Sequence, residues 1–282
     1  ISLFGSPARR IASTSPSPNF TEHISSLYIT IDLTLNAIDV NLKKCIEDFR
    51  KFLSENADEI KTDEDKVIYS LKSDSARELR KFGKEVNSYV VAKRVIPQSY
   101  VISLISQYDA FLGRILKLIF LLQPDILNSS DRNLTFTQLQ RFETISDARD
   151  YILEKQVENI LRLNHFDQFK WMENHFKLPL TKGLDIWSKF IEITERRNLF
   201  VHTGGIVSSQ YLKICEEHLI LDENIHLGDE LHATKKYFIE AYNIIFELGF
   251  KLAQVLWRKF LPDDLIPSRL QFEQNWVRHI GK

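Results

Sequence analysis

Residues 195–205 read Glu-Arg-Arg-Asn-Leu-Phe-Val-His-Thr-Gly-Gly, and this stretch decides how the rest of the chain is interpreted. Apolar residues recur ahead of and within it, from about residue 182, at the spacing of one helix face. They are Ile186, Trp187, Phe190, Ile193, Leu199 and Phe200. Glycine adopts the left-handed backbone that closes a helix without steric cost, so Gly204 and Gly205 predict its end. We therefore expect an amphipathic α-helix with His202 in its last turn or just past it.

Positive charge gathers at this helix end. A helix C-terminus carries exposed carbonyls and partial negative charge, which favours each nearby cation by about 0.3–1 kcal/mol. Arg196, Arg197 and a protonated His202 all benefit from this field. The catalytic candidates are Arg197 and His202, with Asn198, Arg196, Thr203 and Tyr211 as supporting residues.

The pattern resembles the signature of the HEPN superfamily, whose members are all-helical ribonucleases. That signature is an arginine, four to six further residues and a histidine, commonly with a polar residue after the arginine. Arg197, Asn198 and His202 fit it. Arg196 also satisfies the spacing, and Asn198 is the reason for choosing Arg197.

The resemblance covers about residues 100–261. Its parts are an apolar helix carrying Tyr108-Asp109-x-Phe111-Leu112, the motif helix, Gly204-Ile206-Val207 leading to Tyr211-Leu212, and Gly228-Asp229-Glu230-Leu231 before a last long helix. It implies an all-α, up-and-down helical bundle with metal-independent endoribonuclease activity. It also implies a composite site in a homodimer, and a role as a toxin or anti-phage effector of the abortive-infection type. Transfer or messenger RNA is then the expected substrate, and a sensor or antitoxin is a candidate partner.

Composition agrees with a folded, all-α protein. The chain has 282 residues, 44% of them hydrophobic, with only nine glycines and eight prolines. The formal charge is −1 and gives no global signal for nucleic acid, so any RNA contact must be local. Two cysteines, Cys45 and Cys215, lack metal-ligand spacing, which favours a reducing, cytoplasmic setting with buried thiols. We expect no cofactor and no bound metal.

Four segments are predicted along the chain. Residues 1–19 read as a flexible lead-in or an upstream remnant. Residues 20–96 read as an antiparallel helical hairpin, with a polar, acidic turn at 55–65 and a second seam from Val67 and Leu71 that ends before Pro97. Residues 97–262 are predicted to form the HEPN-like domain, and 263–282 a C-terminal helical extension, which we interpret as cut from a longer protein. The hairpin is interpreted as a packing or dimerisation arm, with a sensing or substrate-guiding arm as the alternative.

Residues 99–123 are the most hydrophobic stretch. Asp109, Arg114 and Lys117 lie inside it, and each would cost about 2.5–3.5 kcal/mol at the centre of a bilayer. A buried helix of the bundle is therefore predicted rather than a membrane span. Asp109 is either a buried partner for a basic group or a polar contact on an exposed strip.

Ribonuclease chemistry without metal needs two proton transfers. A base takes the proton of the RNA 2′-hydroxyl, whose oxygen attacks the adjacent phosphorus, and an acid protonates the leaving 5′-oxygen. Histidine can serve in either role, and arginine stabilises the charge that develops on the phosphorus. The motif supplies one histidine per chain, so a twofold dimer is expected to complete the site. Within one chain, His165, His175 and Tyr211 are the alternatives for the second group.

Other interpretations remain open at this stage. A non-catalytic regulatory or protein-interaction module, or a nucleotide-binding module, could keep the same helices. The aromatic run around Trp171 could stack bases, but its helical spacing favours core packing. His226 and His232 lie near Asp229 and Glu230, and without a third ligand they are interpreted as surface residues.

Overall fold

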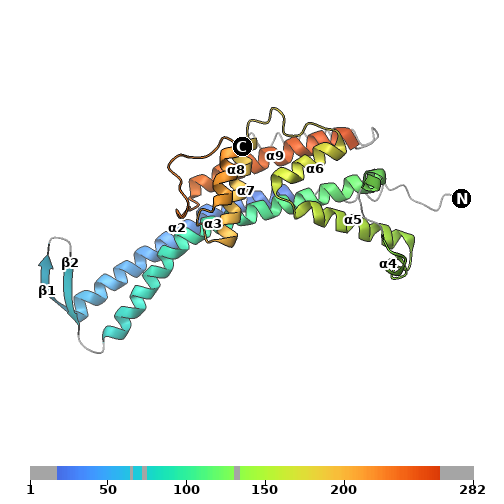
Figure 1. Ribbon diagram of the computed structural model, residues 1–282. Coiled ribbons are helices and arrows are strands. Elements are labelled where there is room, and N and C mark those ends of the chain that lie inside the picture. The colour runs from blue at the N-terminus through green and yellow to red at the C-terminus, as the bar shows by residue number, and fades with distance from the viewer. Residues whose placement is uncertain (1–17, 64–65, 72–74, 130–133, 261–282) are drawn as a thin grey trace.

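A computed structural model describes residues 18–63, 66–71, 75–129 and 134–260 of the chain. Two long helices run side by side as an arm, and the shorter helices gather around one end of it (Figure 1). The regular secondary structure of the described part is helical apart from one β-hairpin at the far end of the arm and a single isolated bridge. The predicted all-α, multi-helix class is confirmed.

The arm consists of α2 (Pro18–Asn56) and the first part of α3 (Ala76–Leu122). Between them lie β1 (Ala57–Asp63) and β2 (Lys66–Leu71), paired antiparallel with Ala57 opposite Leu71. The acidic turn predicted at 55–65 and the helix predicted through Val67 were therefore wrong. The run Lys-Val-Ile-Tyr-Ser-Leu is rich in β-branched and aromatic residues, which favour a strand, and the hairpin pairs its backbone groups.

The break predicted before Pro97 is also absent, because α3 continues through this buried proline. Proline removes one hydrogen bond and bends a helix, and α3 changes direction along its length in Figure 1. Pro97 is itself buried, and α3 makes contacts on both sides of it. Lys93 pairs with Asp39 of α2 at 2.7 Å before it, and Val101 is fully buried after it. The boundary drawn between residues 96 and 97 thus falls inside one helix.

The remaining helices are η2 (Pro124–Ser129), α4 (Phe136–Leu139), α5 (Ile145–Leu161), α6 (His165–Phe176), α7 (Trp187–His202), α8 (Ser209–Glu217) and α9 (Lys235–Phe260). Side-chain caps explain four of the starts, and one of them is the capping box of Thr135 with Gln138 at α4. Thr144 forms a reciprocal capping box with Asp147 at α5, Asn164 caps α6, and Ser208 caps α8 by accepting from the Tyr211 N–H. Each cap satisfies a backbone donor that the first turn leaves free.

The hydrophobic core surrounds the second half of α3. The residues Leu104, Ile105, Tyr108, Leu112 and Leu116 of α3 are inaccessible to solvent. Helices α2, α5, α7 and α9 all contact α3, and α9 also packs on α2. α3 is therefore the central helix of the bundle, as its composition predicted.

Among the described residues, none of the helices has the length and apolarity needed to cross a membrane. The predicted lead-in, apart from its last two residues, and the C-terminal extension lie outside the described residues.

Two helical glycines test how tightly this core is packed. A Cβ added at Gly249 of α9 would lie 2.9 Å from a ring carbon of Phe20, which itself stacks on Phe111 at 4.3 Å between centroids. A Cβ added at Gly83 of α3 would meet nothing within 4 Å. Gly83→Ala should therefore raise the free energy of unfolding by about 0.5–1 kcal/mol through helix propensity, while Gly249→Ala should lower it by about 1–3 kcal/mol. Urea denaturation compares the two, and equal gains in both variants would contradict the packing described.

Candidate functional site

Helix α7 ends at the motif as the sequence predicted. His202 is its last residue and Thr203 its C-cap, followed by Gly204 and Gly205 at φ of 65° and 98°. A Cβ on Gly205 would lie 2.5 Å from the carbonyl oxygen of Leu231, so no other residue fits there without moving the backbone. The glycine turn is held against the segment before α9, because the Leu231 N–H donates to Gly205 at 2.8 Å. Val207 is likewise bonded to Asp229 across this junction, at 2.9 Å.

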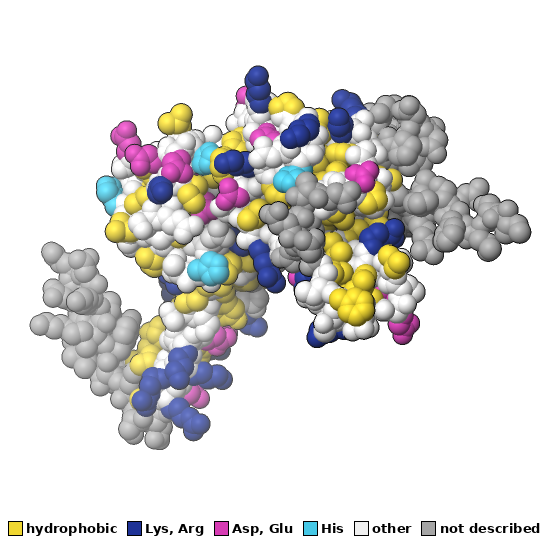
Figure 2. All heavy atoms as spheres, turned by 45° about the vertical axis from the view of Figure 1, so that its right-hand side comes forward, with side chains coloured by type: hydrophobic (Ala, Val, Ile, Leu, Met, Phe, Trp, Pro, Cys, Tyr) yellow, Lys and Arg dark blue, Asp and Glu magenta, His cyan; other side chains and the backbone are white. Residues whose placement is uncertain are grey.

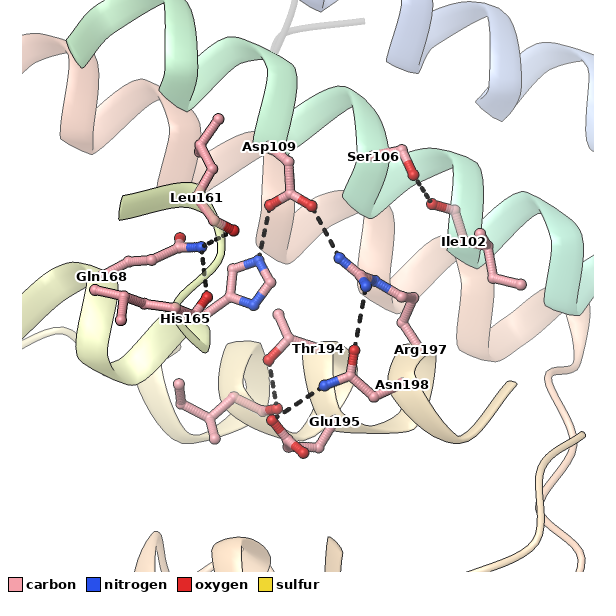
Figure 3. A network of polar contacts seen from close by, with 12 residues as sticks. Ile102, Ser106, Asp109, Leu161, His165, Gln168, Thr194, Glu195, Arg197 and Asn198 are labelled. Atoms are coloured by element: carbon pink, nitrogen blue, oxygen red, sulfur yellow. Dashed lines mark hydrogen bonds and ion pairs between the residues drawn. The ribbon is translucent and has the colours of Figure 1, made fainter. Parts of the chain in front are cut away.

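Arg197 is held by Asp109, which also holds a histidine (Figure 3). Arg197 Nη2 donates to Asp109 Oδ2 at 2.8 Å, and His165 Nε2 lies 2.9 Å from Asp109 Oδ1. The exposed fractions of these side chains are 20% for Arg197, 27% for Asp109 and 6% for His165. Of the two interpretations of Asp109, the structure selects the partner for a basic group. The carboxylate joins α3, α6 and α7.

Asn198 continues this network along α7. Its side-chain oxygen accepts from Arg197 Nη1 at 3.2 Å, and its amide donates to Glu195 Oε1 at 3.4 Å. Glu195 is buried, and burial raises the pKa of its carboxyl, against the lowering effects of the Asn198 hydrogen bond and of His165 and Arg197. Asn198 therefore holds Nη1 of the Arg197 guanidinium, while Asp109 holds Nη2.

Arg196 points into a different, largely buried cluster. Its Nε lies 2.6 Å from Glu192 Oε1, an ion pair whose approach is too oblique for an aligned hydrogen bond, and its guanidinium covers the ring of Tyr237 at 4.4 Å. Tyr211 and Tyr237 each donate to Glu192, at 2.8 and 2.9 Å. Adjacent residues of a helix differ in direction by about 100°, so the two arginines reach separate acids. Within the chain, Arg196 neutralises Glu192.

The other predicted supporting residues lie away from His202 or close the helix. Tyr211 is 2% exposed, and burial, followed by Glu192, raises the pKa of its hydroxyl. Thr203 Oγ1 lies within hydrogen-bond distance of the carbonyls of Leu199 and Ile206, and its single proton serves one of them at a time. Both residues stabilise the surroundings of the motif.

His202 is exposed, and no hydrogen bond, ion pair or ring contact joins it to the described residues. It lies five residues after Arg197, which turns the two side chains about 140° apart around α7. The structure thus brings Arg197 together with Asp109 and Asn198 but does not bring it into contact with His202. Asn198, four residues before His202, shares its face of the helix.

The other histidines that the structure describes each have a partner, including Gln107 for His23 and Phe166 for His218. His175 stacks on Trp171 at 3.9 Å between centroids and bonds the Trp171 carbonyl. His226 lies 3.6 Å from Asp229, and His232 lies 3.9 Å from Glu230. In the part of the chain that the structure describes, no three His, Cys, Asp or Glu side chains come together as metal ligands.

Sequence reasoning missed the acids of the site. Glu192 and Glu195 lie on the buried side of α7, where the apolar pattern had suggested only hydrophobic residues. The signal available was their spacing, because Glu192 is four residues before Arg196 and Glu195 three before Asn198. Comparisons of the chain with protein-family models, with curated proteins and with solved structures found no match.

Asp109→Asn tests the junction of the three helices. The amide loses the charge that Arg197 and His165 share, so the free energy of unfolding should fall by about 1–3 kcal/mol. The matched control is Asp150→Asn, at an exposed carboxylate 3.6 Å from Arg149, which should change stability by no more than about 0.5 kcal/mol. Urea denaturation measures both, and similar small losses would show that Asp109 does not hold the helices together.

Glu195→Gln tests the buried carboxyl through pH. The folded-state pKa of Glu195 is raised above its ordinary value of 4.5, so its contribution to stability is fully present below that pH and is lost as pH rises through the folded-state pKa. Glutamine keeps an oxygen for Asn198 and does not titrate. The stability of wild type relative to the variant should therefore fall as pH rises above 4.5, as measured by urea denaturation. A difference that is constant or grows with pH would contradict the raised pKa.

Proposed function

We propose that the chain is a metal-independent endoribonuclease whose site is completed by a second copy of the chain. One observation carries the proposal: the end of α7 presents a fixed arginine and, within five residues, an exposed histidine that no described residue engages. As part of the same proposal, the enzyme acts as a toxin or anti-phage effector, the role that the HEPN resemblance implies.

Arg197 is suited to hold a phosphate. Its guanidinium has five N–H donors, of which one bonds Asp109 and one bonds Asn198, while Nε is enclosed. Two donors on the outer nitrogens remain for a ligand. Asp109 and Asn198 fix the plane of the group, so little rotational freedom is lost when two phosphate oxygens bind. In the reaction, these donors would stabilise the negative charge that builds on the phosphorane.

His202 is suited to transfer protons. An imidazole that is solvent-accessible and without a partner can take the proton of the RNA 2′-hydroxyl or give one to the leaving 5′-oxygen. The 2′-oxygen forms a bond to phosphorus as the bond to the 5′-oxygen breaks, which leaves a 2′,3′-cyclic phosphate and a 5′-hydroxyl. The site removes one proton from the 2′-hydroxyl and gives one proton to the 5′-oxygen, so the protons balance. The 2′-oxygen is the nucleophile, and no metal-activated water is needed.

A twofold dimer would supply the second histidine that the reaction needs. It would also bring Arg197 of one chain near His202 of the other, although the two side chains diverge within a chain. One chain offers one motif histidine, and Arg197 and His202 diverge around α7. Two apolar side chains near His202 in the chain are exposed, Val201 by 48% and Ile206 by 40%. An isologous contact through these residues would bury them and place two motif helices in one site, so that one His202 acts as base and the other as acid.

His202→Ala provides the test. Cleavage of total RNA and of transfer RNA in EDTA should fall by at least about 100-fold, because a proton-transfer group is lost. The melting temperature should stay within about 2 °C, because the side chain is exposed and has no hydrogen bond or ion pair with the described residues. His23→Ala, at an exposed histidine of α2, is the matched control and should keep full activity.

The products should end in a 2′,3′-cyclic phosphate, which end-group analysis detects. Activity that disappears in EDTA and returns with Mg²⁺ or Mn²⁺ would contradict the mechanism. So would a His202→Ala variant that cleaves as fast as wild type.

A further inference from the structure

The outer part of α3 carries a one-sided row of positive charge. Its members are Arg77, Arg80, Lys81 and Lys84, here called the α3 basic face. Their spacing of three and four residues places them on one side of the helix, and all four are exposed. Among the described residues, no ion pair joins any of them, and the only hydrogen bond that their side chains make runs from Arg80 Nε to the Ala76 carbonyl.

The α3 basic face points away from α2. On the opposite side of α3, Phe82 packs against Phe49 and Phe52 of α2, with ring centroids 5.8 and 5.5 Å apart. The acids Glu78 and Glu85 fall on the flank of the helix, about 90–110° from the centre of the basic row. Figure 2 shows Lys and Arg side chains gathered on the outer arm with few acidic ones among them. In a chain of net charge −1, this is a local segregation of charge.

The basic row and the motif lie on the same side of α3. Lys84 and Asp109 are 25 residues apart, which is about seven turns, so the helical repeat places both on the same side of α3, with the bend at Pro97 between them. Asp109 is the residue that binds Arg197 of the motif. The path along α3 between them is about 37 Å, a length that roughly eleven nucleotides of a strand cover at about 3.4 Å each.

We propose that the α3 basic face binds the phosphate backbone of the RNA that the motif cleaves. This rests on the proposed ribonuclease function and adds a substrate class: RNA long enough to reach from the arm to the motif, read by charge rather than by sequence. Lys and Arg bind phosphates without base preference, and each such contact releases bound counterions. Substrates shorter than about ten nucleotides occupy only the motif.

The chemistry of the face favours a nucleic acid over a lipid surface. A helix that binds a membrane inserts an apolar face beside its basic one. Alongside the basic row, the apolar side of α3 is packed on α2 through Phe82, and the row itself contains no large hydrophobic residue. The exposed valines of α3, Val90, Val91 and Val95, lie further along the helix. The face therefore offers charge alone, which suits a flexible chain of phosphates.

The experiment measures binding separately from cleavage. All variants carry His202→Ala, and fluorescence anisotropy follows a labelled 30-nucleotide RNA and a 6-nucleotide RNA over a range of salt concentrations. The test variant replaces the four residues of the α3 basic face by Gln, which keeps helix propensity. The matched control removes the same charge from exposed positions of α2 in the same arm. Its substitutions are Lys43→Gln, Lys44→Gln, Arg50→Gln and Lys51→Gln. Circular dichroism verifies that each variant keeps its helix content.

The test variant should bind the 30-nucleotide RNA at least about tenfold more weakly. The slope of log affinity against log salt should become shallower by about 3, or about 0.7 for each lost phosphate contact. The control should change both quantities less, and the 6-nucleotide RNA should bind all proteins alike. Equal affinities and slopes in the test and control variants would overturn the proposal, as would a test variant that loses binding to phosphatidylserine vesicles while binding RNA normally.

The two proposals fail in different ways. If the basic face binds RNA but the chain with His202 intact does not cleave it, the ribonuclease function fails and the binding face stands. If the intact chain cleaves RNA while the test variant binds the long RNA normally, the ribonuclease function stands and the binding face fails.

Discussion

The carboxylate of Asp109 is the interaction on which the rest of the site depends. It accepts from Arg197 of α7 and lies against His165 of α6, while its own helix, α3, forms the centre of the bundle. A largely buried acid requires such partners, because an unpaired charge in this position would cost several kcal/mol. The same contacts set the direction of Arg197. The same Asp109 contacts therefore hold the three helices together and orient the candidate catalytic arginine.

Helix α7 departs from a simple amphipathic helix for a related reason. It buries two acids, Glu192 and Glu195, on the side that faces the bundle. Glu192 is neutralised by Arg196 and by two tyrosine hydroxyls, whereas Glu195 has Asn198 and the nearby Arg197. With Arg196 committed to Glu192, Arg197 is the arginine left at the motif with donors to spare. His202, beyond the last of these contacts, is held only by the backbone of the helix end.

Much of the fold follows from local sequence signals. Periodic apolar residues predicted α2, α6, α7 and α9, and the glycines after Thr203 predicted the end of α7. Local signals failed where distant contacts decide. Pro97 normally ends a helix, but packing against α2 and the core carries α3 through it. The β-hairpin was missed because a short acidic segment before Val67 resembled a turn, and pairing across it is not visible in a local pattern.

The candidate site also combines features that local sequence predicts with features that depend on distant contacts. The positions of Arg197 and His202 at the end of α7 were predictable from spacing, because a helix fixes the geometry of residues five apart. The partner of Asp109 was not, since it lies 88 residues away along the chain. For the same reason the sequence left Arg196 and Arg197 as alternatives: only the positions of Glu192 and Asp109 in space separate their environments. The contribution of a second chain could not be predicted from residue spacing either, because it depends on which surfaces of the folded protein meet.

The shared site is the central claim, and mixed dimers test it most directly. Wild-type and His202→Ala chains carrying different affinity tags can be coexpressed, and dimers with one chain of each kind isolated on both tags. If each reaction needs both copies of His202, these mixed dimers should cleave RNA at far less than half the rate of wild-type dimers. A rate close to half would contradict the account, because each chain would then work alone.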